Sequence, residues 1–168
     1  MLGRLTGEAG IEIIYGGGRV GLMGLLADAA LAAGGRVTGV IPSHLYEREV
    51  GHGGLNELIV VGSMHERKQR MFELADAFVT LPGGLGTLDE TIEIMTWKQL
   101  GLHDKPHIVV DIGGYWAPFS ALVEHVIATG FTGAAARTFF HVVTRVEDVL
   151  PVIAALPPSR HAGDSALV

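Results

Sequence analysis

The nine residues Pro82–Glu90 (Pro-Gly-Gly-Leu-Gly-Thr-Leu-Asp-Glu) constrain what this chain can fold into more than any other segment. They follow the apolar run Ala77–Leu81, which predicts a buried strand, and lead into a helical pattern over Leu88–Leu100. Three glycines at such a junction let the backbone turn sharply and approach a ligand closely. The N–H groups and the dipole at the start of the helix favour an anion such as phosphate. The segment therefore predicts an anion site between a strand and a helix.

Apolar runs of strand length alternate with stretches of helical period along the rest of the chain. This alternation predicts an α/β fold with a Rossmann-like, doubly wound, mostly parallel sheet flanked by helices. With 168 residues, we expect a single domain over residues 1–156 and a flexible tail over 157–168. Residues 43–57 are predicted to form a loop. The remaining predicted strands are Ile11–Tyr15, Val37–Ile41, Leu58–Val61, His107–Ile112 and Phe140–Thr144, and the remaining helices Leu22–Ala33, Ser63–Ala75, Trp116–Thr129 and Val146–Leu156.

Composition excludes several classes of function. A net charge of −6 argues against general nucleic-acid binding, which requires a basic face. No apolar stretch reaches the 18 residues that would indicate a membrane span. The chain has no cysteine, and its eight histidines show no metal-ligand spacing, so we expect neither disulfides nor a metal. A cytoplasmic location agrees with these features.

A second glycine-rich loop, Gly16–Gly21, also follows a predicted strand and precedes a helix. In a doubly wound sheet such loops gather at the carboxyl ends of the strands, where ligands bind. Neither loop is a Walker A motif, because no Lys-Ser/Thr follows its last glycine. Gly16-x-Gly18-x-x-Gly21 fits the dinucleotide fingerprint by letter, but Pro42 and Ser43 stand where an acidic residue is needed. The pair of loops predicts a nucleotide or phosphate site rather than an NAD site.

Basic residues near the start of a predicted helix form a second constellation, Met64-His65-Glu66-Arg67-Lys68. Arg67 and Lys68 are electrostatically misplaced there, because the helix dipole favours acidic groups at that end. One interpretation is a solvated charged face. The other is that an anionic ligand near the helix end removes the mismatch. Ser63 with Glu66 predicts a capping box at the same point.

Glu90 also has two interpretations. Thr87-x-x-Glu90 matches a capping box, so that the carboxylate would only secure the helix start. Alternatively, the carboxylate acts on some part of a ligand other than its phosphate. The two roles differ in a testable way, because replacing a capping Glu with Gln has little effect.

These motifs resemble those of a known family. Met64–Lys68 and Pro82–Glu90 are similar to the paired MHxRK and PGGxGTxxE signatures of the LONELY GUY family, and the resemblance covers Ile11 to about Leu156. Its members are cytokinin riboside 5′-monophosphate phosphoribohydrolases, often mislabelled as lysine decarboxylases. The resemblance implies hydrolysis of a nucleoside 5′-monophosphate, a cytokinin riboside monophosphate or AMP, to free base and ribose 5-phosphate. We find no setting for a pyridoxal-phosphate lysine.

The resemblance also implies site residues. Arg67 and Glu90 would be catalytic, with Glu90 engaging the ribose hydroxyls or the attacking water. Lys68 would hold the substrate, and Glu49 would lie near the base. Backbone N–H groups of the glycine segment would hold the phosphate. The full set of implied substrate-binding residues is Gly17, Gly18, Glu49, Lys68, Gly84, Leu85, Gly86, Thr87, Leu88, Asp89 and Thr96.

Three further expectations follow from the resemblance. The activity requires no cofactor, and members are typically homodimers. Members also begin with a strand followed by a Gly-Ser-Ser segment, and we expect that first strand to be absent from this chain. An alternative function is a non-catalytic nucleotide or cofactor carrier, because a PGGxGT loop also occurs in molybdenum-cofactor carrier proteins and in other relatives.

Overall fold

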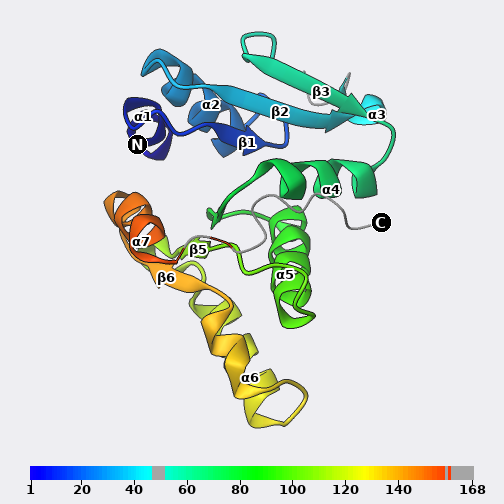
Figure 1. Ribbon diagram of the computed structural model, residues 1–168, viewed down its shortest axis with the longest axis vertical. Helices are drawn as coiled ribbons and strands as arrows, with labels where there is room; N and C mark the ends of the chain where they lie inside the picture. The colour runs from blue at the N-terminus through cyan, green and yellow to red at the C-terminus, as the bar shows by residue number, and fades with distance from the viewer. Residues whose placement is uncertain (47–51, 158, 160–168) are drawn as a thin grey trace. The chain divides into compact units, whose positions relative to one another are not determined.

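The computed structural model describes residues 1–46, 52–157 and 159. The chain divides into two compact units, Met1–Ala75 (unit 1) and Asp76–Val168 (unit 2), which are described separately (Figure 1). Each unit contains a parallel three-stranded sheet with helices packed on it. Among the described residues, no helix is both long and apolar enough to cross a membrane.

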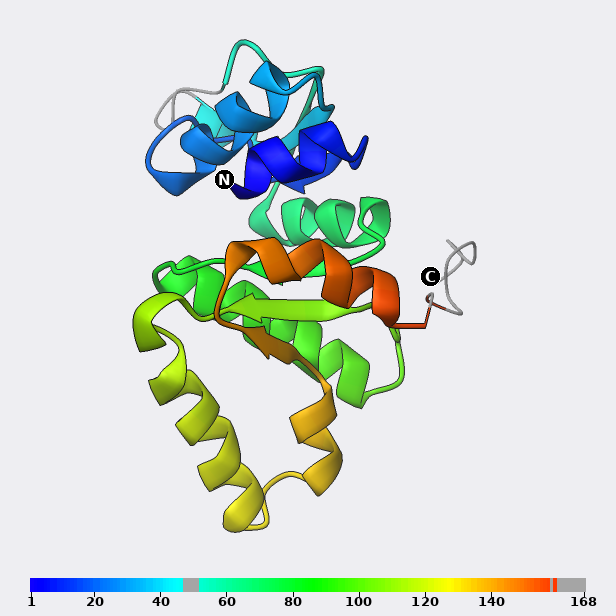
Figure 2. The same cartoon turned by 90° about the vertical axis from the view of Figure 1, so that its left-hand side faces the viewer.

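Unit 1 has the strand order β1-β2-β3, and all its strands are parallel. The central strand β2 is buried along its whole length, as its apolar run predicts. Thr38 is paired with Ile14 on one side and with Glu57 on the other. The helix α1 packs against α2 (Figure 2). The elements are α1 (Leu2–Glu8), β1 (Ile13–Tyr15), α2 (Leu22–Ala32), β2 (Val37–Pro42), α3 (Ser43–Tyr46), β3 (Glu57–Val61) and α4 (Met64–Leu74).

Unit 2 has the strand order β4-β5-β6, again parallel. Its central strand β5 is buried throughout, and Val109 is paired with Thr80 on one side and Val142 on the other. The elements are β4 (Phe78–Thr80), α5 (Leu85–Gln99), β5 (His107–Val110), η1 (Ile112–Gly114), α6 (Ala117–Ala128), η2 (Ala134–Thr138), β6 (His141–Val143), η3 (Val146–Asp148) and α7 (Val149–Ala155).

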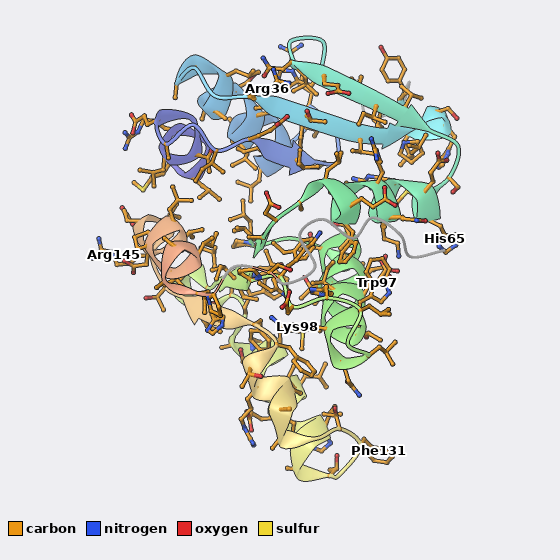
Figure 3. The ribbon with its side chains drawn as sticks, viewed as in Figure 1. Arg36, His65, Trp97, Lys98, Phe131 and Arg145 are labelled. Atoms are coloured by element: carbon orange, nitrogen blue, oxygen red, sulfur yellow. The ribbon has the colours of Figure 1, made fainter. Side chains whose placement is uncertain are left out.

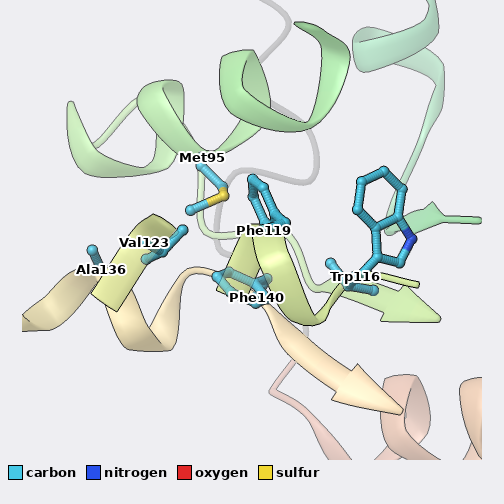
Figure 4. Close-up of a cluster of buried hydrophobic side chains, with 7 residues drawn as sticks. Met95, Trp116, Phe119, Val123, Ala136 and Phe140 are labelled. Atoms are coloured by element: carbon cyan, nitrogen blue, oxygen red, sulfur yellow. The ribbon is translucent and has the colours of Figure 1, made fainter. Parts of the chain in front are cut away.

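An aromatic cluster forms the core of unit 2 (Figure 4). The ring of Phe119 meets the Trp116 ring edge-on, with centroids 5.9 Å apart, and lies 5.6 Å from the ring of Phe140. Met95 of α5 and Val109 of β5 complete the contact, so the cluster ties α6 to the sheet and to α5. Aromatic pairs of this geometry stabilise a core beyond their buried area.

The α/β class with parallel strands is confirmed, and three details are corrected. The described strands form two sheets rather than one, because each strand is hydrogen-bonded only to strands of its own unit. Residues Ser43–Tyr46, predicted as loop, form the single-turn helix α3. Helix α5 begins at Leu85 rather than Leu88, because Gly84 is its N-cap. Of the predicted tail, only Pro157 and Ser159 are described, and the Ser159 hydroxyl donates to the Asp104 carboxylate.

Phe119→Ala tests the aromatic cluster. Removing a ring that is 5% exposed leaves a cavity, and the free energy of unfolding should fall by about 3–5 kcal/mol. Leu122→Ala, on the same helix but 55% exposed, is the control and should change it by less than about 0.5 kcal/mol. Urea unfolding followed by tryptophan fluorescence measures both, because both tryptophans lie in unit 2. Equal losses in the two variants would contradict the assignment.

Candidate functional site

In unit 1, the first turn of α4 is fixed by a capping box. The Ser63 hydroxyl accepts a hydrogen bond from the Glu66 N–H at 3.1 Å. The Glu66 carboxylate in turn accepts from the N–H of Gly62 at 2.7 Å. This confirms the capping prediction, with Gly62 rather than Ser63 as the backbone donor to Glu66. The capped turn sets the direction in which the next residue, Arg67, leaves the helix.

Arg67 is the buried residue of α4, with 9% of its surface exposed. Its Nε donates to the Val40 carbonyl of β2 at 3.2 Å, and its Nη1 lies 3.9 Å from the Met64 sulfur. Its Nη2 occupies the space in which a side chain at Gly16 would begin. Interpreting Arg67 as part of a solvated charged face is therefore wrong. The guanidinium is inserted against the first glycine loop.

The other predicted residues of unit 1 lie around this contact, with one exception. Gly17 and Gly18 are buried in the loop that follows β1, and Gly17 has a left-handed φ of 75°. Lys68, next to Arg67, is half-buried. Glu49 lies outside the described residues. The structure thus brings the first glycine loop and the Arg67 segment together within unit 1.

Two residues that sequence reasoning did not single out, His52 and Asp28, support the same loop. The backbone N–H of His52 donates to the Gly17 carbonyl at 3.2 Å, and its Nε2 lies 2.8 Å from an Asp28 carboxylate oxygen. Its Nδ1 accepts from the Gly54 N–H, so the Nε2 atom carries the proton and donates to Asp28. Burial, together with the charge of Asp28, raises the pKa of Tyr15 to about 12, so its hydroxyl stays protonated. Sequence spacing gives no signal for these contacts, because they join segments far apart in the chain.

In unit 2, the second glycine segment turns between β4 and α5. Gly84 is an extended N-cap, and no described side chain caps the helix. Thr87, in the first turn, packs on Gly83 so closely that a Cβ at Gly83 would overlap its hydroxyl. A helix start that no side chain caps presents its N–H groups to an anion. This geometry agrees with the anion site predicted at Gly84, Gly86 and Thr87.

The capping interpretation of Glu90 is wrong. A capping box requires Thr87 at the N-cap, but the helix begins three residues earlier, with Gly84 as its N-cap. Glu90 is therefore the sixth residue of α5, half-buried in the second turn. Its carboxylate is not needed to satisfy the first N–H groups of the helix.

The remaining predicted residues lie on α5 itself rather than in a loop. Leu85 and Asp89 are exposed, whereas Leu88 packs against the aromatic core. The Leu88 N–H already donates to the Gly84 carbonyl at 3.1 Å, so it is not available to a ligand. Thr96 is exposed and its hydroxyl donates to the Ile92 carbonyl. At 1.5 Å per residue, Thr96 lies about 14 Å along the axis from Thr87, so it is not near the predicted phosphate site.

Tyr115 is a further residue that the sequence analysis did not identify. Its hydroxyl donates to the Gly83 carbonyl at 2.6 Å and so fixes the glycine segment from the other side. Asp111, which follows β5, accepts from the Trp116 N–H at 2.8 Å and orders the turn that carries Tyr115. The signal in the sequence is Gly113-Gly114-Tyr115, which follows a strand at the ligand edge.

A cavity of about 460 Å³ in unit 2 lies elsewhere, among residues of α6, η2, β6 and α7. Val123, Phe140 and Val143 contribute to its lining, and Arg137 forms a bidentate ion pair with Glu124 beside them. None of the predicted catalytic or substrate-binding residues lines it. The candidate residues therefore lie in the two motif segments, one in each unit, rather than in this cavity.

Comparison with known proteins agrees with the motifs. Residues 23–153 match the family described as "Possible lysine decarboxylase". The chain is 45% identical over 153 residues to a cytokinin riboside 5′-monophosphate phosphoribohydrolase of Rhodococcoides fascians, covering 90% of this chain and 77% of that protein. It is 41% identical over 157 residues to the phosphoribohydrolase LOG of Oryza sativa subsp. japonica, covering 89% of this chain but 65% of the rice protein.

Solved structures share the fold. The molybdenum cofactor binding protein from Rippkaea orientalis aligns with a TM-score of 0.67 at 22% identity, covering 92% of this chain and 82% of that one. The molybdenum cofactor carrier protein of Chlamydomonas reinhardtii aligns with a TM-score of 0.66 at 19% identity over the same shares. At these identities the likeness establishes the fold alone.

Gly16→Ala tests the insertion of Arg67. The added methyl group occupies the position of Nη2, so the guanidinium must move away from the Val40 carbonyl. Such overpacking should lower the free energy of unfolding by about 1–3 kcal/mol, measured by urea unfolding with far-ultraviolet circular dichroism. Gly53→Ala is the control, because its added methyl group meets no atom within 4 Å. A Gly16→Ala variant as stable as Gly53→Ala would contradict the contact.

Proposed function

The chain belongs to the LONELY GUY family, and on that premise we propose that it hydrolyses the N-glycosidic bond of a nucleoside 5′-monophosphate. The observation that carries the proposal is the 45% identity to a named phosphoribohydrolase over 90% of this chain, which includes both motifs. The products are the free base and ribose 5-phosphate. The carbon–nitrogen bond at C1′ breaks, water supplies the new oxygen at C1′, and the departing base takes up a proton.

In the proposed reaction, unit 2 holds the phosphate and stabilises the sugar. The helix start after Gly84 supports phosphate binding through the N–H groups of Gly84, Gly86 and Thr87. Breaking the bond builds positive charge on the ribose, and a carboxylate stabilises that charge. Glu90 is assigned this role, through the ribose hydroxyls or the attacking water. Its position in the second turn of α5 supports the assignment, because it places the carboxylate on the helix whose start is assigned to the phosphate.

The two cationic side chains of the proposal belong to unit 1. Arg67 orients the substrate and assists the departing base, and Lys68 holds the substrate beside it. The buried position of Arg67 against Gly16 supports this role, because a guanidinium held in one place is ready to bind without loss of side-chain freedom. Gly17, Gly18, Glu49 and Thr96 complete the proposed substrate contacts.

The proposal includes two candidate bases, a modified adenine and plain adenine. The relatives are named for cytokinin riboside monophosphates, which carry a modified adenine, and AMP is the unmodified candidate. An apolar pocket discriminates by only about 1–3 kcal/mol between substrates that differ by a few methylene groups. Both monophosphates are therefore to be assayed. A cytoplasmic location stays a prediction.

A homodimer is also part of the proposal. Large exposed apolar side chains in unit 2 support it: Phe131 is 88% exposed (Figure 3), and Leu100 is 66% exposed. A hydrogen bond between Gln99 and Thr132 brings their segments together. Sedimentation equilibrium measures the mass, and a mass of one chain at micromolar concentration would contradict the dimer.

The alternative function, a non-catalytic carrier, has support from the fold alone. The cofactor carriers align at 22% identity or less, whereas the phosphoribohydrolases align at 41–45%. Tight binding of a phosphorylated ligand with no release of base would favour the carrier.

Glu90→Gln tests the catalytic assignment. Loss of the carboxylate charge should lower kcat by about 10²–10³-fold, because the transition-state cation loses its electrostatic partner. Free adenine or isopentenyladenine, separated chromatographically after incubation with the corresponding monophosphate, gives the rate. The circular dichroism spectrum should be unchanged.

Glu147→Gln is the matched control, because Glu147 pairs with Arg145 on the surface and belongs to neither motif. It should retain the rate of the parent chain. A Glu90→Gln variant with full activity would overturn the role of Glu90, and a parent chain that releases no base from any nucleoside monophosphate would overturn the proposed function.

A further inference from the structure

Three buried polar side chains form a hydrogen-bonded row in unit 2. His107 of β5 reaches Thr80 of β4 with its Nε2, which lies 2.9 Å from the threonine oxygen. The hydroxyl of Thr80 lies 3.1 Å from that of Thr91 on α5. The exposed fractions of the three residues are 1%, 8% and 3%. The row therefore joins two strands of the sheet to the helix that follows the glycine segment.

The proton positions in the row follow from its surroundings. Burial is the main cause that lowers the pKa of His107 to about 3, with Lys98, His103 and His141 adding to it, so the ring is neutral. Its Nδ1 has no hydrogen-bond partner among the described residues. An unsatisfied acceptor is tolerated better than an unsatisfied N–H donor, so the proton lies on Nε2 and is donated to Thr80. The Thr80 hydroxyl is then free to donate to Thr91.

Packing alone does not explain polar groups at this place. The next core positions along the two elements are apolar: Val109 of β5 and Met95 of α5, one turn beyond Thr91. Apolar contacts hold a helix against a sheet but set its rotation about its own axis only loosely, because they are not directional. A hydrogen bond between a helix hydroxyl and a strand hydroxyl has a defined direction. The row therefore adds a directional contact between α5 and the sheet.

We propose that Thr91, held by Thr80 and His107, is a positioning residue that sets the rotation of α5 and thereby the direction in which the adjacent Glu90 is presented. The inference rests on the proposed function for its effect on activity. Side chains extend to about 5–6 Å from a helix axis, so a rotation of about 20° displaces a carboxylate by about 2 Å. A displacement of about 1 Å in a reacting group can lower a rate by about 10²-fold.

The phosphate site should respond less to the same rotation. It is formed by backbone N–H groups at the end of the helix, and these lie closer to the axis than side-chain ends do. Tyr115 also fixes Gly83 independently of the row. Loss of the row is therefore expected to lower kcat much more than it changes KM.

Thr91→Val is the decisive variant, because valine keeps the shape of threonine and removes only the hydroxyl. We expect kcat for nucleoside monophosphate hydrolysis to fall at least about tenfold, with KM changed by less than about twofold. Thr91→Ser, which restores the hydroxyl, should recover most of kcat. Thr6→Val is the control, because this buried hydroxyl donates within its own helix α1 to the Gly3 carbonyl. It should leave both constants unchanged.

A second measurement reports the rotation without turnover. Residual dipolar couplings of the backbone N–H groups along α5 vary with the helical period, and their phase relative to those of β5 gives the rotation of the helix. Thr91→Val should shift this phase and Thr91→Ser should not. An unchanged phase or an unchanged kcat in an active Thr91→Val chain would overturn the inference. A phase shift in a chain whose parent releases no base would uphold the positioning and overturn the proposed function instead.

Discussion

The buried guanidinium of Arg67 is the constraint on which the arrangement of unit 1 depends. A charge removed from water is strongly destabilising unless polar atoms are placed around it. Here the Val40 carbonyl accepts from Nε, and the absence of a side chain at Gly16 leaves room for Nη2. Strand β2, the first glycine loop and helix α4 are therefore linked by one side chain.

In unit 2, as in unit 1, a glycine leaves room for a nearby side chain. Gly83 leaves room for Thr87, and Tyr115 holds the Gly83 carbonyl from outside the segment. In both units a glycine loop after a strand is shaped by protein side chains before any ligand binds. Such preorganisation lowers the entropy lost on binding, so a small anion can be held by few contacts. The motif glycines therefore serve the packing of the site as well as the approach of a ligand.

The sequence predicted the strands, most helices and the α/β class, because these depend on local periodicity. It failed where a distant or competing contact decided the outcome. Ser63 and Thr87 each precede a Glu by three residues, but only Ser63 is an N-cap, because the extended Gly84 starts α5 earlier. His52 and Tyr115 were not foreseen, since their partners lie 24 and 32 residues away. Burial of Arg67 likewise depends on Gly16, which no local pattern of α4 reveals.

The carboxylate of Glu90 lies on the same helix whose start is assigned to the phosphate. Two energies are to be compared: the repulsion between carboxylate and phosphate, and the attraction between carboxylate and the cationic sugar. Two unit charges about 7 Å apart, across a ribose, repel by about 2 kcal/mol at an effective dielectric constant of about 20. The same carboxylate about 4 Å from a cationic sugar carbon is attracted by about 4 kcal/mol. The repulsion is present in both the ground state and the transition state, whereas the attraction arises only as the bond breaks. In the proposed reaction, this arrangement weakens substrate binding and lowers the barrier, which raises kcat rather than tightening the complex.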